Sequence, residues 1–132
     1  MNDYQAQGEN FLKKTGTKMT VKFVKYGPHF PGEKESRDIF RVTFARSGRK
    51  ISILFGQSIN DSTGDGGKPP TAYDVLACII KSDPYDFHTF CNEYGYDDDS
   101  RKAMSMFKAV EREWKKVNLL FGDVIGELQE IN

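Results

Sequence analysis

The chain has 132 residues, of which 38% are hydrophobic and 13% aromatic, so its length and composition fit one domain with a hydrophobic core. Its 19 Lys and Arg residues balance 19 Asp and Glu residues, which excludes a uniformly basic protein that coats nucleic acid. No apolar run reaches the roughly 18 residues of a membrane span, and the first residues lack the pattern of a signal peptide, so we expect a cytoplasmic protein without a membrane partner.

The first half of the chain predicts a short helix followed by an antiparallel sheet. Residues 3–14 suit a helix, and Gly16 is a typical residue just beyond a helix end. Apolar residues then occupy every second position in three segments, as in strands with one buried face. These segments are 19–24, 39–45 and 50–55.

Three connections follow from the turn residues of this half. Ser47 and Gly48 suit a tight hairpin between the second and third strands, because glycine readily adopts a positive φ. Residues 27–35 are rich in Pro and Gly and predict a projecting loop between the first and second strands. Residues 60–70 contain no apolar residue besides prolines, so they predict a flexible linker.

After this linker the apolar period changes from two to about 3.6, which indicates helices. Thr71 and Asp74 have the spacing of a capping box at a helix start. Asp83 followed by Pro84 is a second start signal, and the helix that it opens is expected to end before Gly95.

The longest predicted helix begins at Asp98 or Asp99 and ends at Gly122, and Asp123 begins a last short helix. The apolar residues of the longest helix recur every three or four positions, which is typical of one buried helix face. The predicted stripe consists of Ala103, Phe107, Val110, Trp114, Val117 and Phe121.

The order of these elements predicts a single α+β domain over residues 1–132, because strands and helices are grouped rather than alternating. We expect an N-terminal helix, a three-stranded antiparallel sheet and then three to four C-terminal helices packed on one sheet face. The domain would comprise a basic α-β-β-β half at 1–59, the linker at 60–70 and an acidic helical half at 71–132.

The balanced net charge hides a separation of charge along the chain. Residues 1–69 carry twelve Lys or Arg and seven Asp or Glu, whereas residues 70–132 carry seven and twelve. Such a basic half suits a polyanionic or acidic partner, and two solvated faces are the simpler alternative. Strand parity predicts an uncovered sheet face made of Thr20, Lys22, Val24, Ile39, Arg41, Thr43, Lys50, Ser52 and Leu54.

Basic residues of this half are the candidate binding residues. Lys22, Arg41 and Lys50 share the uncovered face, and further cations and loop residues lie near it in the sequence. The strand phenylalanines share the inward parity, which disfavours a platform for stacking bases and leaves contacts with a nucleic-acid backbone or an acidic protein. The full candidate set is Lys22, Arg41, Arg46, Arg49, Lys50, His29 and Phe30.

Catalytic motifs and hard-metal sites are incomplete in this sequence. It contains no nucleophile elbow, phosphate-binding loop or paired-histidine metal motif, so we expect neither an enzyme nor a cofactor, although a site built from scattered residues would leave no such motif. Residues 61–66 resemble the start of a calcium loop, but Ala72 stands where a bidentate Glu is needed. Residues 97–99 could gather magnesium, yet they suit a helix start better.

A zinc site would need nearly every soft ligand in the chain. His88 and Cys91 lie three positions apart on a predicted helix, and only Cys78 and His29 remain to complete four ligands. We expect instead that both cysteines are reduced core residues and that no metal is bound.

The helix, three strands and helix over residues 3–80, with Gly27-Pro28-His29 after the first strand, resemble a double-stranded-RNA-binding domain. In that family a Gly-Pro-x-His loop reaches the minor groove, which would give His29 an RNA contact. The family's basic block at the start of the last helix has no counterpart here, where Asp74 occupies the first turn.

A second resemblance extends over nearly the whole chain. It is carried by residues 37–40 (Arg-Asp-Ile-Phe), 55–59 (Phe-Gly-Gln-Ser-Ile), 70–78 (Pro-Thr-Ala-Tyr-Asp-Val-Leu-Ala-Cys), 90–96 (Phe-Cys-Asn-Glu-Tyr-Gly-Tyr) and 128–132 (Leu-Gln-Glu-Ile-Asn). These stretches resemble small proteins encoded by phages, prophages and plasmids of gut and related bacteria. The resemblance implies a mobile-element context and a location in the host cytoplasm, without a particular mechanism.

Together these observations predict a non-enzymatic accessory protein that acts by stoichiometric binding. The expected partner is a host or phage protein, as for a counter-defence inhibitor of the anti-CRISPR kind. Direct RNA or DNA binding through the basic sheet face is the alternative, and it would show a strong dependence on salt concentration.

Overall fold

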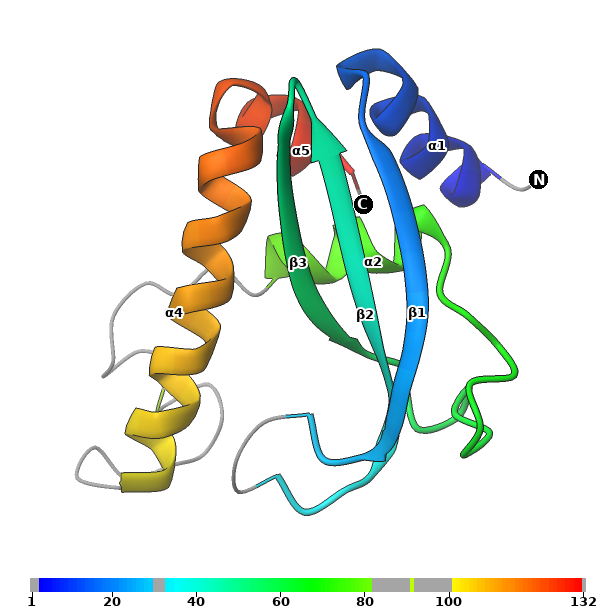
Figure 1. Ribbon diagram of the computed structural model, residues 1–132, viewed down its shortest axis with the longest axis vertical. Helices are drawn as coiled ribbons and strands as arrows, with labels where there is room; N and C mark the ends of the chain where they lie inside the picture. Colours follow the sequence, from blue (N-terminus) through cyan, green and yellow to red (C-terminus); the bar gives the residue numbers. More distant parts are fainter. Residues whose placement is uncertain (1–2, 30–32, 82–90, 92–100, 132) are drawn as a thin grey trace.

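The computed structural model describes residues 3–29, 33–81, 91 and 101–131. It has an α+β fold in which an N-terminal helix and a three-stranded antiparallel sheet precede C-terminal helices, as predicted (Figure 1). The helix predicted from Asp83 lies outside the described residues, apart from Cys91, which is helical and buried. In chain order the elements are α1 (Asp3–Thr15), β1 (Lys18–Gly27), β2 (Arg37–Arg46), β3 (Arg49–Gly56), α2 (Ala72–Lys81), α4 (Arg101–Phe121), η1 (Gly122–Val124) and α5 (Ile125–Gln129).

The sheet is a meander with the strand order β1-β2-β3. Ser47 (φ 51°) and Gly48 (φ 78°) form the predicted turn between β2 and β3, and two positive φ angles are typical of a type I′ hairpin. Val42 in the central strand lies opposite Val21 and Ile53. All three side chains therefore point to the same face, which fixes the register of the sheet.

The hydrophobic core lies between the inner face of the sheet and the helices. In Figure 1, α2 crosses behind the strands and α4 lies beside β3. Phe121 of α4 packs against Phe44 of β2 and Phe11 of α1, with ring centroids 5.4 and 5.6 Å away. Eight residues of this core cluster are at most 1% exposed: Phe40, Val42, Phe44, Ala72, Val75, Leu76, Phe121 and Leu128.

Local signals set the ends of α1 and α2 as predicted. Beyond α1, Gly16 adopts a φ of 67°, and the N–H of Thr17 donates to the carbonyl of Leu12 over 2.8 Å, as in a Schellman motif. Before α2, the N–H of Thr71 donates to the Asp74 carboxylate (3.0 Å), and the N–H of Asp74 donates to the Thr71 hydroxyl (3.2 Å). This reciprocal pair is a capping box.

The buried stripe of α4 follows the predicted spacing in part. Phe107 and Trp114 are only partly buried, whereas Met106 and Leu120, each next to a predicted position, are buried. A helix that packs on several elements buries a stripe wider than one line of residues. The buried members of the predicted stripe are Ala103, Val110, Val117 and Phe121.

Residues 60–70 are attached to one end of the sheet by Asp38, whose side chain is 0% exposed. Its carboxylate accepts hydrogen bonds from the N–H groups of Thr63 (2.8 Å) and Gly64 (2.9 Å). The hydroxyl of Ser62 accepts a hydrogen bond from the N–H of Asp38 (3.0 Å). The flexibility of this linker stays a prediction, and these bonds restrain it in a way that its composition does not reveal.

Candidate functional site

The candidate site is the outer face of the sheet, which points away from the core. Lys22, Arg41 and Lys50 are all exposed there, and Lys18 joins them because β1 begins one residue earlier than predicted. Cations from different strands thus lie on both sides of a row of hydroxyl groups. Across β1, β2 and β3 the rows are Lys18–Ala45–Lys50, Thr20–Thr43–Ser52 and Lys22–Arg41–Leu54.

One end of this face is covered, contrary to the prediction for Ile39. Ile39 is 1% exposed and lies opposite Gly56. A Cβ atom on Gly56 would lie 2.7 Å from Cδ of Arg37 and 3.1 Å from Nδ1 of His29, so both side chains lie over this end of the sheet. Strand parity cannot reveal this cover, because it comes from residues next to the loop between β1 and β2.

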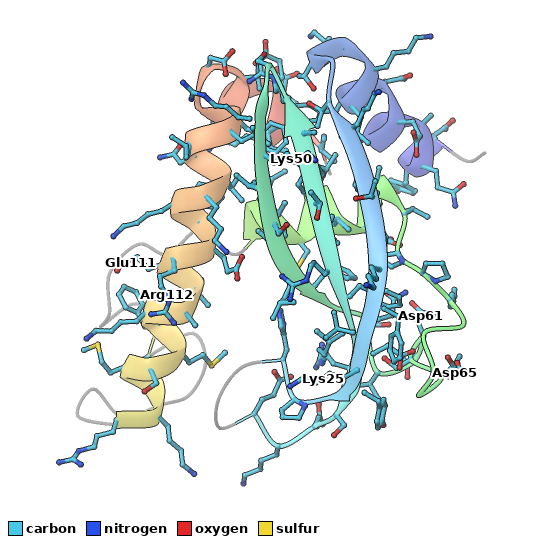
Figure 2. The ribbon with its side chains drawn as sticks, viewed as in Figure 1. Lys25, Lys50, Asp61, Asp65, Glu111 and Arg112 are labelled. Carbon is cyan, nitrogen blue, oxygen red and sulfur yellow. The ribbon has the colours of Figure 1, made fainter. Side chains whose placement is uncertain are left out.

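A bulge in β1 changes which residue continues the outer face. After Phe23 the register shifts, so Lys25 rather than Val24 lies opposite Ile39, and Val24 is the extra residue. Figure 2 shows Lys25 and Lys50 near opposite ends of the sheet. We define the cationic face as Lys18, Lys22, Lys25, Arg41 and Lys50.

Arg46 and Arg49, both predicted to bind a partner, are turned toward the helices. The Arg46 guanidinium donates to both oxygens of Asp123 (2.6 and 2.8 Å), to the carbonyl of Leu120 (2.8 Å) and, through Nε, to that of Thr15 (3.2 Å). Its side chain is only 13% exposed. The guanidinium of Arg49 lies 3.5 Å from the carbonyl oxygen of Leu119, near the end of α4. Arg46 therefore joins β2 to the C-terminal ends of α1 and α4.

We expect the Arg46→Ala variant to lower the free energy of unfolding by about 2–3 kcal/mol at neutral pH, because the carbonyls of Thr15 and Leu120 lose their donor. The hydrogen bonds from Arg46 also lower the pKa of Asp123 from 3.8 to about 2. A carboxyl whose pKa is lowered on folding stabilises the fold above its unfolded pKa, and this contribution is lost as the pH falls from about 3.8 to about 2.

Urea unfolding of both chains as a function of pH tests this prediction. The unmodified chain should lose stability over that acidic range more steeply than Arg46→Ala, which lacks the ion pair. Arg46→Lys should lie between them, because lysine keeps the charge without the planar fork. Identical pH profiles for Arg46→Ala and the unmodified chain would contradict the assignment.

His29 closes the free edge of β3 rather than projecting from its loop. Its Nε2 lies 3.0 Å from the carbonyl oxygen of Leu54 and donates a hydrogen bond, because a carbonyl only accepts. Lys116 of α4 donates to the carbonyl of Ser52 on the same edge (3.0 Å). Burial lowers the pKa of His29, although its hydrogen bond to Leu54 favours the charged form. Phe30, the other predicted loop residue, lies outside the described residues.

A small cavity of about 50 Å³ lies between β3, α2 and α4, and its described lining is mostly apolar. His29 and Glu113 are its titratable lining residues besides Cys78. Burial raises the pKa of Glu113, against the effect of Lys116 and other nearby cations, and burial lowers the pKa of His29. Both shifts favour the neutral forms, so this cavity suits an apolar group better than an ion.

In the segment that resembles a calcium loop, the carboxylates of Asp61 and Asp65 are hydrogen-bonded to nearby side chains. Lys68 pairs with Asp61 (2.7 Å) and lowers the pKa of that carboxyl. The hydroxyl of Thr63 donates to Asp65 (2.6 Å) and lowers the pKa of that carboxyl in the same way. Figure 2 shows both aspartates on the loop beyond β1. Among the described residues, no three His, Cys, Asp or Glu side chains are grouped so that they could hold a metal ion.

Aromatic rings of the strands lie mainly on the inner face, as predicted. Phe40, Phe44 and Phe55 are buried, and the ring of Phe23 packs edge-on against Phe40 with centroids 5.7 Å apart. Tyr26, beyond the bulge, is 53% exposed. The three rows of the open outer face contain no ring, so they offer charge and hydroxyl groups but no stacking surface.

Comparisons with protein-family models, with curated proteins and with solved structures gave no match. Within the described part of the chain, no helix has both the length and the hydropathy that crossing a bilayer requires. Function is therefore inferred from the geometry of the cationic face.

Proposed function

We propose that this chain is a non-enzymatic accessory protein of a phage or other mobile element, and that it binds one partner stoichiometrically through the cationic face. The partner that fits best is an acidic surface of a host or phage protein in the cytoplasm, as for a counter-defence inhibitor of the anti-CRISPR kind. The observation that carries this proposal is the grouping of cations from three strands on one open face without a strand carboxylate.

The dimensions of the face support an extended contact rather than a site for one small ion. Residues rise about 3.3 Å along a strand and strands lie about 4.8 Å apart, so Lys18 and Lys22 are about 13 Å apart while Lys22 and Arg41 are neighbours across a strand pair. The hydroxyls of Thr43 and Ser52, which share a 2.9 Å hydrogen bond, keep the centre of the face polar. Such a surface complements a broad acidic patch.

A nucleic-acid partner is the second candidate, and the hydroxyl row favours it because hydroxyl and ammonium groups both contact phosphate oxygens. The lack of rings in the rows of the open face favours protein over single-stranded nucleic acid. The RNA contact implied for His29 by the likeness to double-stranded-RNA-binding domains is not supported, because its Nε2 is bound to Leu54.

We expect charge reversal on the cationic face to weaken partner binding by about 100-fold, since like charges across an interface cost several kcal/mol. The test variant is Lys22→Glu with Arg41→Glu. The control is Lys102→Glu with Lys108→Glu, which changes the net charge equally at exposed positions of α4. Each chain is used in a quantitative pull-down from a bacterial lysate, with protein and nucleic acid both measured in the eluate, and the affinity for the recovered partner is then measured with purified components.

Loss of binding in the test variant and retention in the control support the cationic face. Equal affinity of the test variant and the unmodified chain would contradict it. A recovered nucleic acid whose affinity falls steeply with salt concentration assigns the second candidate function instead.

A further inference from the structure

The two edges of the sheet, formed by β1 and β3, differ in whether their outward backbone groups have hydrogen-bond partners. The edge of β3 is occupied, because His29 and Lys116 bind the carbonyls of Leu54 and Ser52. β1 has β2 as its only strand neighbour in the described sheet. An open edge presents unpaired N–H and C=O groups that can pair with another extended chain.

Hydrogen-bond alternation identifies which groups of β1 face outward. The carbonyls of Ser52 and Leu54 point away from β2, so their opposite residues, Thr43 and Arg41, direct their backbone groups toward β1. The β1 residues opposite them, Thr20 and Lys22, therefore direct their own N–H and C=O groups toward β2 and form the backbone hydrogen bonds of this strand pair. The outward groups belong to the alternate residues Met19, Val21 and Phe23, which have no hydrogen-bond partner among the described residues outside the sheet.

We propose that the edge formed by Met19, Val21 and Phe23 takes an extended acidic segment of the partner as a fourth strand. This inference rests on the proposed function, because it specifies the acidic partner of the cationic face. Strand addition gives affinity through the main chain, and side chains at alternate positions give specificity.

The two faces of β1 specify the side chains of that segment. On the outer face, Lys18 and Lys22 are exposed and would lie beside every second residue of the added strand. On the inner face, Met19, Val21 and Phe23 are partly buried against the core. The fitting segment therefore alternates acidic residues on the outer side with apolar residues on the inner side.

Charge distinguishes this occupant from a second copy of the chain. Two antiparallel copies of β1 would bring Lys18 and Lys22 of both chains into neighbouring positions, and like charges on adjacent strands are destabilising. An acidic strand forms opposite-charge pairs at the same positions. The open part of the β1 edge is also short. It begins after the buried Thr17 and ends near Phe23, where Gly66 lies so close that an added Cβ would be 2.5 Å from the ring of Phe23.

Amide hydrogen exchange in the unmodified chain is the first test. Without a ligand, the amides of Thr20 and Lys22 should exchange slowly and those of Met19, Val21 and Phe23 rapidly. Addition of a short peptide in which Glu and Val alternate should protect these three amides. A peptide of the same composition with all its Glu residues first should protect them much less.

Val21→Pro is the matching variant, because proline removes an N–H that faces away from β2 and is tolerated on an edge strand in that orientation. We expect it to weaken peptide binding about tenfold relative to Val21→Ala, which keeps the N–H. Lys22→Glu with Arg41→Glu should also weaken binding.

The outcomes separate the two proposals. If binding depends on Lys22 and Arg41 but the three amides stay unprotected, or if the alternating peptide does not bind, the edge inference is overturned while the cationic face stands. If charge reversal leaves partner affinity unchanged, the proposed function fails first. Protection that rises with protein concentration alone assigns the edge to a second copy, and an oligonucleotide that binds without protecting the edge points to nucleic acid; either result overturns the acidic strand.

Discussion

The Gly8→Ala variant is expected to lose about 3 kcal/mol of unfolding free energy, because overpacking at a tight contact is strongly destabilising. Gly8 is buried in α1, where a Cβ atom would overlap the backbone N of Tyr73 and lie 2.8 Å from its Cα and 2.9 Å from the carbonyl carbon of Ala72. These are backbone atoms of α2, so they cannot move aside as the end of a flexible side chain can. The two helices would have to separate.

The sign of this effect is opposite to that at an ordinary helix position, where alanine is more stable than glycine by up to about 1 kcal/mol. Gly126 in α5 is the matched control, because a Cβ atom there would meet nothing within 4 Å. Gly126→Ala should therefore unfold at the same or a higher urea concentration than the unmodified chain. A Gly8→Ala midpoint as high as that of Gly126→Ala would show that α1 and α2 are not in this close contact.

The Asp38→Asn variant is expected to lose about 2–4 kcal/mol, because hydrogen bonds to a buried charged group are worth about 1.5–3 kcal/mol each. The carboxylate accepts from the N–H groups of Thr63 and Gly64, and an amide of the same shape places a donor against one of these donors. Fast hydrogen exchange of both amides should accompany the loss. Residues 60–70 would then have the mobility that their composition predicts.

Asp65→Asn is the control for this variant. Asp65 also accepts hydrogen bonds in the same loop, from the Thr63 hydroxyl and the N–H of Gly67, but it is exposed. Water can replace those bonds, so the urea midpoint should change little. If both variants were equally stable, burial of Asp38 would not be what attaches the loop to the sheet.

Features decided by neighbouring residues were predictable from the sequence. The capping box of Thr71 and Asp74 and the turn at Ser47 and Gly48 depend on contacts within a few positions, and the structure has both. The parity of the strands is equally local, which is why Lys22 and Arg41 are correctly placed on one face.

Features decided by distant residues were not predictable. In the sequence, Arg46 and Arg41 are both cations of the basic half, and nothing distinguishes them. The partner of Arg46, Asp123, is 77 positions away. Asp38 bonds to a segment 25 positions away, and Ile39 is buried at the end of the sheet where His29, which lies beyond β1, comes close to Gly56. The one signal in the sequence was the position of Asp38, two residues before Phe40 and therefore on the inward parity, because a carboxylate there needs donors from elsewhere in the chain.

The long sequence separation between Arg46 and Asp123 matters while the chain is being synthesised on the ribosome. At about 5–20 residues per second, the 77 positions between them take about 4–15 s to translate. During this interval the inner face of the sheet, including Phe44, has already been made while its covering ring, Phe121, has not. The nascent chain therefore leaves the part of the apolar inner face that α4 covers exposed for seconds, and we expect it to depend on chaperones until α4 has emerged.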